Sequence, residues 1–412
     1  MLDKGEQIAI WGTGMYAKKV YMLQSKNYEV VCFYDNDKTK WNQEIYGIPI
    51  KKWDHRRDIK IIIASSWWEE IIEQLLDEDL HVLENVIPYH LVSCQCIHYN
   101  DLRKISKWCY DIEFPIKQLK GNRKVAVIYG NCQTLLLREI LLLNRSFADQ
   151  YFFIAIPAVC DYNAGEEARE LWNTLLAHDE FWSQIDLFLC QKVNESNKFC
   201  RDLATDNIIG KLASDCQIVM LINIYFNGYF IQRVENTNNV MKEVHQSGLF
   251  PSADIFVDEL LKRGFLNDDI LKQIQDRAFI SPPIIERAVS QSLLELQDRE
   301  KEVAVGISDY IEQRYKEKQL FYSPNHPINA VLIEYARRII RFMGLTDQEI
   351  SEDLVYLKAG CLKGQDIPIY PSVIETLGMK HYDCLYYINR YLEPEILVGF
   401  DEYIRKYILY CF

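Results

Sequence analysis

Apolar residues along the chain form two regions of short hydrophobic runs separated by amphipathic stretches, followed by a third region with helical periodicity. Short runs rich in β-branched residues are typical of strands buried on both faces of a parallel sheet. These runs cover 7–11, 28–34 and 60–66 in the first region, and 125–129, 151–157, 186–190 and 216–225 in the second. The alternation predicts an α/β fold with two doubly wound modules.

From about residue 250 onward, apolar residues recur at spacings of three and four, which predicts a helical C-terminal part. The expected helices are 253–263, 268–278, 283–314 and an amphipathic helix between Pro327 and Gly344. The last segment is aromatic and also helical in character. We expect it either to pack on the second module or to form a contact in a homo-oligomer.

These patterns divide the chain into four parts. We predict a Rossmann-like module over 1–92, a connector over 93–122, a second α/β domain over 123–350 and a helical extension over 351–412. The connector is mixed in polarity and ends in a basic stretch just before the second domain begins.

The first module has a glycine-rich turn directly after its first strand. Gly12 and Gly14 fit a tight strand-to-helix turn, and Asp35 and Asn36 end the second strand about 20 residues later. This spacing is typical of a nucleotide-binding βαβ unit. The pattern is weak by itself, because small residues also allow close packing of a helix on a strand. No set of residues for hydride transfer accompanies it, so redox chemistry with a nicotinamide cofactor is not favoured.

Composition excludes several classes of function. The formal net charge of −13 argues against a general nucleic-acid binder, because such proteins need a basic face. The polar N-terminus does not resemble a signal peptide, and the longest nearly apolar stretch, 218–231, is too short to span a bilayer. We therefore expect a cytoplasmic protein without a membrane span.

The chain has twelve cysteines, which we expect to be reduced thiols in the cytoplasm. Cys94 and Cys96 form the only closely spaced pair, and their spacing does not suit zinc, so we predict no metal site. Cys32, Cys160 and Cys190 lie in apolar runs, where free cysteine is typically inert core.

Cys132 differs from the other cysteines by its position. It lies in the turn Gly130-Asn131-Cys132-Gln133, between a strand expected to be buried and a helix. Ligands of open α/β sheets bind at such turns, and free amide groups at a helix N-terminus stabilise a thiolate or an anion. The side-chain amides of Asn131 and Gln133, together with the backbone of the turn, are candidate donors for a developing oxyanion. Gln191 and Asn223 end later strands and are candidate residues of the same cleft, or satisfied structural amides.

A cysteine nucleophile needs a base. His326 is the first candidate, because it follows Asn325 and immediately precedes the amphipathic helix that begins after Pro327. His326 and Asn325 are equally compatible with capping or packing at that helix start. His245 lies in a polar turn and is the second candidate histidine, with contact to the substrate as its expected role, although an ordinary loop histidine is the simpler interpretation. An enzymatic site requires that Cys132 and His326 meet in one crevice.

Two motifs, Gly130-Asn131-Cys132-Gln133 and Asn325-His326-Pro327, resemble the WcbI family of capsular polysaccharide biosynthesis enzymes over about residues 124–345. The segment from Asn223 to Gly228 is a weaker third match. The resemblance implies coenzyme A binding and acetyl transfer to a capsule sugar. It also implies a three-layer architecture of the SGNH-hydrolase or flavodoxin-like type, in which Cys132 takes the place of the usual serine. The third member of a catalytic triad has no counterpart in the motifs.

Coenzyme A carries phosphates that need cationic groups. The candidates near the expected strand ends are Arg138, Lys192, Lys198 and Arg201, which are otherwise ordinary surface charges. The first module, with Gly12-Thr13-Gly14, Asp35-Asn36-Asp37 and Gly47-Ile48-Pro49-Ile50, resembles a small Rossmann-like module found in bacterial polysaccharide clusters. That resemblance implies binding of a nucleotide or nucleotide-sugar, or a docking role.

The leading hypothesis is an O-acetyltransferase that moves an acetyl group from acetyl-coenzyme A to a hydroxyl of a sugar or polysaccharide precursor. Either Cys132 carries the acetyl group, or His326 deprotonates the sugar hydroxyl for direct attack. Two alternatives remain: an esterase or deacetylase that uses the same site, and a non-catalytic nucleotide-sugar binding protein.

Overall fold

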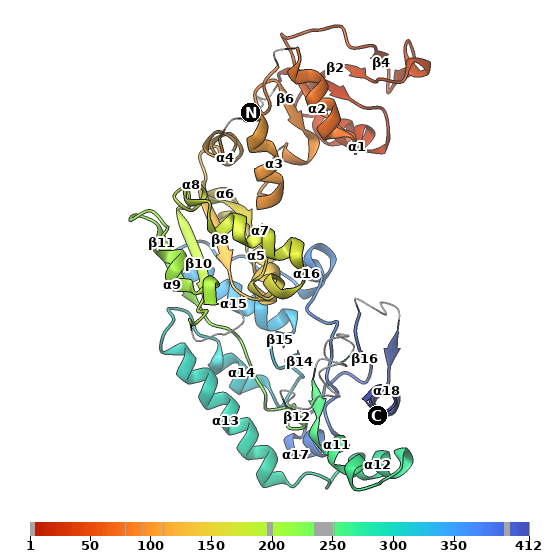
Figure 1. The fold of residues 1–412 in the computed structure, drawn as a ribbon, viewed down its shortest axis with the longest axis vertical. Helices are drawn as coiled ribbons and strands as arrows, with labels where there is room; N and C mark the ends of the chain where they lie inside the picture. Colours follow the sequence, from red (N-terminus) through yellow and green to blue (C-terminus); the bar gives the residue numbers. More distant parts are fainter. Residues whose placement is uncertain are drawn as a thin grey trace.

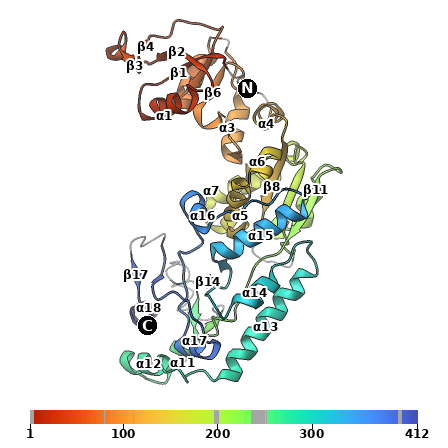
Figure 2. The ribbon, with the colours of Figure 1, turned by 180° about the vertical axis from the view of Figure 1, so that it is seen from behind.

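The structure is a computed structural model that describes residues 5–78, 80–92, 94–109, 111–195, 201–234, 250, 252–390 and 396–411. The molecule is elongated, with one sheet near the N-terminal end, a second sheet in the middle and a mainly helical part at the other end (Figure 1). The view from behind shows the same order along the long axis (Figure 2). The prediction of two α/β modules with a helical C-terminal part is confirmed.

The first sheet has six strands in the order β3-β4-β2-β1-β5-β6. Its strands are β1 (Gln7–Trp11), β2 (Glu29–Tyr34), β3 (Glu44–Ile45), β4 (Ile48–Lys51), β5 (Lys60–Ile63) and β6 (Val86–Pro88). All neighbours are parallel except β3 and β4. Helix α1 (Met15–Gln24) follows β1, and α2 (Trp68–Leu76) follows β5. Because β1 lies between β2 and β5, its carboxyl end is the point where the strand order reverses.

The second sheet has five parallel strands in the order β11-β10-β8-β9-β7. Its strands are β7 (Cys96–His98), β8 (Lys124–Tyr129), β9 (Tyr151–Ala155), β10 (Leu187–Gln191) and β11 (Gln217–Leu221). β8 lies between β10 and β9, so the turn after β8 is the topological switch point of this sheet. The fourth strand predicted for this region extends only to Leu221, because the chain leaves the sheet there to bond with residues of the site.

The segment predicted as a connector is built into the structure. It supplies the edge strand β7, followed by helices α3 (Tyr99–Cys109) and α4 (Glu113–Lys120). Apolar side chains of α3 and α4 pack in one continuous core with a face of each sheet. The second sheet therefore begins earlier in the chain than the hydrophobic pattern indicated.

Helices cover both faces of the second sheet. On one face, α5 (Cys132–Leu143) and α15 (Asn329–Phe342) share a core with inward side chains of β8, β9 and β10. On the other face, α7 (Glu166–Leu176) contributes Trp172 and Leu175 to the second core. The result is a sheet between two helical layers. The shorter elements of this part are α6 (Arg145–Gln150), α8 (Asp179–Trp182) and α9 (Thr205–Ile209).

The C-terminal part is mainly helical. Its helices are α11 (Ile255–Lys262), α12 (Asn267–Ile274), α13 (Pro282–Glu300), α14 (Ser308–Arg314), α16 (Glu352–Ala359), α17 (Pro371–Leu377) and α18 (Phe400–Cys411). Its short strand pairs are β12 (Arg233–Val234) with β13 (Ala253–Asp254), β14 (Phe321–Ser323) with β15 (His326–Pro327), and β16 (Tyr386–Tyr387) with β17 (Leu397–Val398). None of the helices in the described ranges combines the length and apolarity needed to cross a bilayer.

The single helix predicted over 283–314 is wrong. The chain turns between α13 and α14, and the carboxylate of Glu300 accepts hydrogen bonds from the backbone N–H groups of Ile307 and Ser308. A carboxylate at a helix N-terminus satisfies donors that have no partner within the helix. A local interaction of Glu300 therefore starts a second helix where periodicity alone suggested continuity.

The final helix packs on the rest of the C-terminal part. The hydroxyl of Tyr407 in α18 accepts from the backbone N–H of Asp254 at 2.9 Å and donates to the carboxylate of Asp258 at 2.8 Å. Tyr403 and Ile404 are also buried in the main core. One of the two roles expected for the last segment is thus observed, and a contact between copies stays a prediction.

Candidate active site

The turn after β8 is shaped by close contact with β10. A Cβ atom on Gly130 would lie 2.3 Å from Oε1 of Gln191, so only glycine allows this approach. Gln191 Oε1 accepts the backbone N–H of Asn131 at 2.9 Å. The Asn131 side chain then caps α5 by accepting the backbone N–H of Gln133 at 3.0 Å. These bonds fix Cys132 as the first residue of α5, at the switch point of the sheet.

The structure brings Cys132 and His326 together. Sγ of Cys132 lies 3.4 Å from Nε2 of His326, although the residues are far apart in the chain. Burial lowers the pKa of His326 to about 4, so the imidazole is neutral near pH 7. A neutral ring that accepts the thiol proton at Nε2 carries its own proton on Nδ1. Nδ1 is buried and has no hydrogen-bond partner among the described residues, so no third triad member is seen there.

A buried amide network places the histidine opposite the cysteine. Nε2 of Gln133 donates to the carbonyl oxygens of Ile224 and Asn325, each at 2.7 Å. Oε1 of Gln133 accepts the backbone N–H of Ile224 at 3.1 Å. The predicted role of Gln133 as an oxyanion donor therefore has no support in this geometry, because its amide is committed to holding the segment that carries His326.

The other predicted amides have different environments. Gln191 is buried, and its Nε2 donates to the carbonyl of Ile222 at 3.2 Å. Asn223 is exposed, and its Oδ1 accepts from Nδ2 of Asn131 at 2.9 Å. Asn325 lies in the tight turn of the β14–β15 hairpin, and its Oδ1 is 3.4 Å from the Ser323 hydroxyl. Asn223 is thus the predicted amide best placed to meet a substrate.

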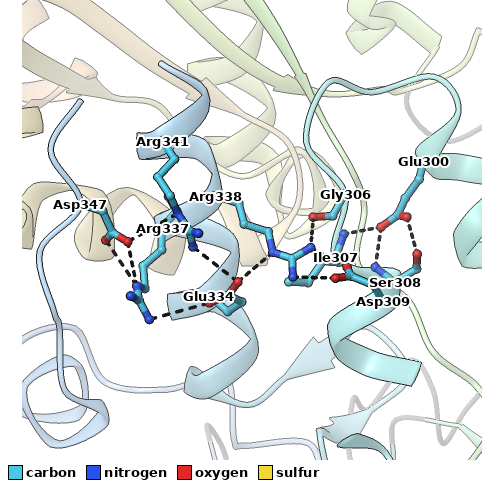
Figure 3. A network of polar contacts seen from close by, with 10 residues as sticks. All are labelled: Glu300, Gly306, Ile307, Ser308, Asp309, Glu334, Arg337, Arg338, Arg341 and Asp347. Carbon is cyan, nitrogen blue, oxygen red and sulfur yellow. Dashed lines mark hydrogen bonds and ion pairs between the residues drawn. The ribbon is translucent and has the colours of Figure 1, made fainter. Parts of the chain in front are cut away.

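Helix α15, which follows His326, is fixed by a polar network on its outer face (Figure 3). Arg338 bonds to Asp309 of α14 and to Glu334 of its own helix, and its Nη1 donates to the carbonyl of Gly306. Arg337 pairs with Asp347 at 3.1 Å. Glu300 connects this network to α13. The network ties α15 to α14 and to the segments on either side of it.

Cys160 is a site residue that the sequence reasoning missed. Its apolar neighbours suggested a core position, but the structure leaves it exposed. The turn that carries Cys160 is joined to the loop before Cys132, because the backbone N–H of Val159 donates to the carbonyl of Gly130 at 2.8 Å. Interaction with Cys160 and burial raise the pKa of Cys132, and interaction with Cys132 lowers the pKa of Cys160. The sequence signal for Cys160 was its position in the loop after β9, because β9 lies next to β8 in the sheet.

The cations predicted for phosphate binding are mostly engaged elsewhere. Arg138 is buried and pairs with Glu139 at 2.8 Å, and Lys192 pairs with Glu302 at 2.7 Å. Arg201 is exposed at the start of a short 3-10 turn. Lys198 and His245 lie outside the described residues. None of these predicted roles is tested by the geometry.

Two other arginines flank the segment that carries Asn223. The guanidinium of Arg299 lies 5.7 Å from the ring centroid of Tyr225 and donates to its carbonyl at 2.8 Å. Arg233 donates to the Tyr225 hydroxyl at 2.7 Å. Within the described ranges, no carboxylate lies within ion-pairing distance of either arginine. The sequence did not indicate Arg233 and Arg299 as site residues, because they come from separate elements, β12 and α13, that only the fold brings together.

The first sheet carries its own pocket at its switch point. Its cavity of about 530 Å³ is lined by the turn after β1, the end of β2 and the start of α2. Gly12 has φ +115, and a Cβ there would lie 2.7 Å from the Ala64 carbonyl oxygen. Asp35 accepts from Thr13 and from Lys40. Gly14 caps α1 without a side chain, and Asn36 bonds to Gln74 at 3.0 Å at the rim.

The fold and the site together define a three-layer α/β protein with a thiol–imidazole pair at the carboxyl edge of a parallel sheet. Residues 125–348 match the family described as polysaccharide biosynthesis enzyme WcbI. The chain belongs to this family. Residues 4–87 match a second family, described as C2185-like, N-terminal.

The chain is also similar to a solved structure of WcbI. The two share 18% sequence identity with a TM-score of 0.57, over 70% of this chain and 90% of that chain. That structure is described as a polysaccharide biosynthesis enzyme, in a native form without a disulfide bond between coenzyme A and a cysteine. At this identity the similarity establishes the fold. No curated protein matches the chain.

Proposed function

We propose that the protein is an O-acyltransferase that moves an acetyl group from acetyl-coenzyme A to a hydroxyl of a sugar or polysaccharide precursor. The observation that carries the proposal is the 3.4 Å contact between Cys132 Sγ and His326 Nε2, at the switch point of a sheet in a WcbI-family chain. The solved WcbI structure, whose description names coenzyme A, supports the choice of donor.

In the proposed reaction, His326 acts as the general base. Its neutral Nε2 takes the proton from Cys132, and the thiolate attacks the thioester carbonyl to form an acyl-enzyme with release of the coenzyme A thiol. The sugar hydroxyl, deprotonated by His326, then attacks the acyl group and frees Cys132. The raised pKa of Cys132 makes a base necessary for the first step. Asn223, whose amide is oriented by Asn131, is the proposed donor to the developing oxyanion.

A variant pair distinguishes this route from direct attack by the sugar. Cys132→Ala abolishes transfer if Cys132 carries the acyl group, but leaves partial transfer if His326 only deprotonates the hydroxyl. His326→Ala abolishes both routes. Rapid hydrolysis of an aryl acetate without a sugar acceptor, lost in Cys132→Ala, would instead favour the esterase alternative.

We infer that Arg233 and Arg299 contact the phosphates of coenzyme A. Both guanidinium groups lie around Tyr225, next to the exposed Asn223. Arg233→Ala should raise the KM for acetyl-coenzyme A by about tenfold, since a charge-assisted bond contributes about 1.5–3 kcal/mol. Lys192→Ala is the matched control, because Lys192 is already paired with Glu302. Equal effects of the two variants would exclude this assignment.

A second binding function is proposed for the first module: a nucleotide or nucleotide-sugar in the pocket after β1. Its support is the cavity lined by Gly12, Gly14 and Asp35 at a switch point. Trp67 lines this pocket with 67% of its surface exposed, so its fluorescence is a direct probe. Titration with uridine diphosphate should quench it, and Asp35→Ala should weaken the change, with Asp58→Ala as control. An unchanged spectrum at millimolar nucleotide would reject this proposal.

A further inference from the structure

Two adjoining cavities form a groove in the C-terminal part. The first cavity, of about 460 Å³, lies between β14, the start of α16 and the segment 380–384. The second cavity, of about 790 Å³, lies between the residues just after α12, helix α17 and the start of α18. Tyr382 and Cys384 line both cavities, and both residues are exposed. We call the two cavities together the C-terminal groove.

One end of the groove is built by the hairpin that carries His326. Tyr322 lies in β14 and Ile328 directly follows β15, and both residues line the first cavity. The hairpin pairs Ser323 with His326, and the backbone N–H of Ile328 donates to the carbonyl of Leu320 at 2.9 Å. Ile328 therefore lies at most about 7 Å along the chain from His326. Because β14 lies nearer to the second sheet than α17 does, the groove leads from the hairpin away from that sheet (Figure 1).

The polar groups of the first cavity are held in place by buried bonds. Gln319 is 5% exposed, its Oε1 accepts the backbone N–H of Asp383 at 2.9 Å, and its Nε2 donates to the carbonyl of Phe321 at 2.8 Å. Nζ of Lys363 donates to the Asp383 carboxylate at 2.7 Å and lies 5.5 Å from the ring centroid of Tyr322. A carboxylate has several acceptor sites, so Asp383 can still accept from a ligand hydroxyl.

The second cavity combines an apolar floor with a polar rim. Ile369 and Tyr386 on its floor are buried, whereas Tyr382 at the junction is 40% exposed. At the rim, Arg277 pairs with Glu375 at 3.0 Å. Sugar rings present apolar C–H faces and hydroxyl edges, which suit aromatic rings and polar side chains respectively.

The charges along the groove are balanced. Among its described lining residues, three cationic side chains are matched by three carboxylates: Lys318, Lys380 and Arg277 against Glu352, Asp383 and Glu375. A nucleic acid or another polyanion needs an excess of cations, which this lining lacks. A hydrocarbon chain would leave the carboxylates and amides of the first cavity without partners. The lining therefore favours a neutral ligand with many hydroxyl groups.

We propose that the C-terminal groove binds a neutral oligosaccharide, which makes the acceptor a chain of several sugar units and not a free monosaccharide. Cavities of about 300–1,000 Å³ each hold a drug-sized ligand, so two adjoining cavities have room for several linked rings. The end at the His326 hairpin orients one sugar unit towards the thiol–imidazole pair. This use of the groove rests on the proposed acyl transfer, whereas binding of the chain does not.

The test is calorimetric titration of the full chain, without acetyl-coenzyme A, with malto-, manno- and N-acetylchito-oligosaccharides of one to six units. The hexasaccharide of at least one series should bind at least about tenfold more tightly than its monosaccharide, because contacts in the second cavity are added. A hexasaccharide of hyaluronan, which carries carboxylates, should bind more weakly. Failure of every neutral series to gain affinity with length, or tighter binding of the hyaluronan chain, would overturn the proposal.

Variants locate the binding. Tyr382→Ala should weaken binding of the neutral hexasaccharide about tenfold, since a stacked aromatic ring at the junction is lost. Tyr46→Ala is the matched control, because Tyr46 is an exposed tyrosine of the first module, at 49%. Arg277→Ala alters a side chain that is 75% exposed, so the fold should persist, and it should weaken binding of the hexasaccharide but not of the disaccharide. Unchanged binding in both groove variants would contradict the assignment.

The outcome is separable from that of the proposed function. Cys132→Ala should bind the hexasaccharide as the natural chain does, because Cys132 does not line the groove. Binding without acyl transfer would leave the groove assigned and refute only the transfer. Transfer to a monosaccharide without any gain from a longer chain would refute only the groove.

Discussion

The turn after β1 and the turn after β8 occupy equivalent positions, because each follows the middle strand of a parallel sheet and leads into a helix. Each turn needs a glycine where another element approaches: Gly12 beside Ala64, and Gly130 beside Gln191. The surroundings differ. The pocket at the first turn is lined only by residues between Trp11 and Gln74, all from its own sheet and helices.

The second turn receives its chemistry from a distant part of the chain. His326 comes from a hairpin in the C-terminal part, and Cys160 comes from the loop after β9. Burial of the imidazole at this turn lowers the pKa of His326. The comparison indicates that a switch point supplies a place for a ligand, whereas reactivity depends on which side chains the rest of the fold delivers there.

The strongest way to separate the two turns is to remove the reactive pair. Cys132→Ala and His326→Ala should each lower acyl transfer roughly a hundred- to ten-thousandfold, because both the nucleophile and its base are needed. Nucleotide binding at the first turn, followed by Trp67 fluorescence, should not change. Loss of that binding in either variant would show that the two turns are coupled.

The histidine should also give the second turn a distinct dependence on pH. The pKa of His326 is about 4 in the folded chain and near 6.5 when unfolded, so the unfolded state binds the proton first as the pH falls. The stability from this group is complete above pH 6.5 and is lost towards pH 4, by about 3 kcal/mol in total. Urea unfolding of the natural chain and of His326→Gln should therefore converge as the pH falls over this range.

Other buried groups change the free energy of unfolding with pH in the opposite direction. The effect of His326 is therefore measured as the difference in the free energy of unfolding between the natural chain and His326→Gln. Burial raises the pKa of Asp254 to about 7. Its contribution to stability is therefore lost as the pH rises towards and through 7. A difference between the two chains that does not depend on pH would contradict the assignment for His326.

Glycine substitutions should show whether a turn needs glycine because another side chain packs closely against it. Gly130→Ala places a Cβ against Gln191 and Thr134 and should lower the free energy of unfolding by about 2–3 kcal/mol, with loss of transfer activity. Gly14→Ala is the matched control at the first turn, where a Cβ meets nothing within 4 Å. Thermal unfolding should separate the two. Equal stability of both variants would mean that Gln191 can move aside freely.

The smallest expected effect concerns the scaffold behind His326. Arg338→Ala removes the bonds from α15 to Asp309 and Glu334 and should lower the free energy of unfolding by about 1–2 kcal/mol. Transfer activity should fall more than nucleotide binding, because α15 packs on the second sheet, whereas no residue of α15 lines the pocket at the first turn. Lys301→Ala, which removes an exposed pair with Asp298, should leave both unchanged.

Local pattern predicted much of this arrangement. The buried strands, the turn that carries Cys132, and the helix that follows His326 were all visible as runs and periodicities. Pattern failed at the break between α13 and α14, because a single side chain, Glu300, starts the second helix. It also failed at Cys160, whose apolar neighbours suggested burial.

The sequence by itself determined the class of fold, the two switch-point turns and the identity of the candidate nucleophile. These depend on nearest neighbours along the chain, since strand, glycine turn and helix follow one another directly. Only the tertiary structure decided that His326 meets Cys132 and that the turn carrying Cys160 is bonded to Gly130. It also decided that Gln133 holds a hairpin instead of facing a ligand, and that Arg233 and Arg299 both bond to Tyr225. Such contacts arise because strand order and helix packing bring distant segments to one edge, and no local periodicity encodes that geometry.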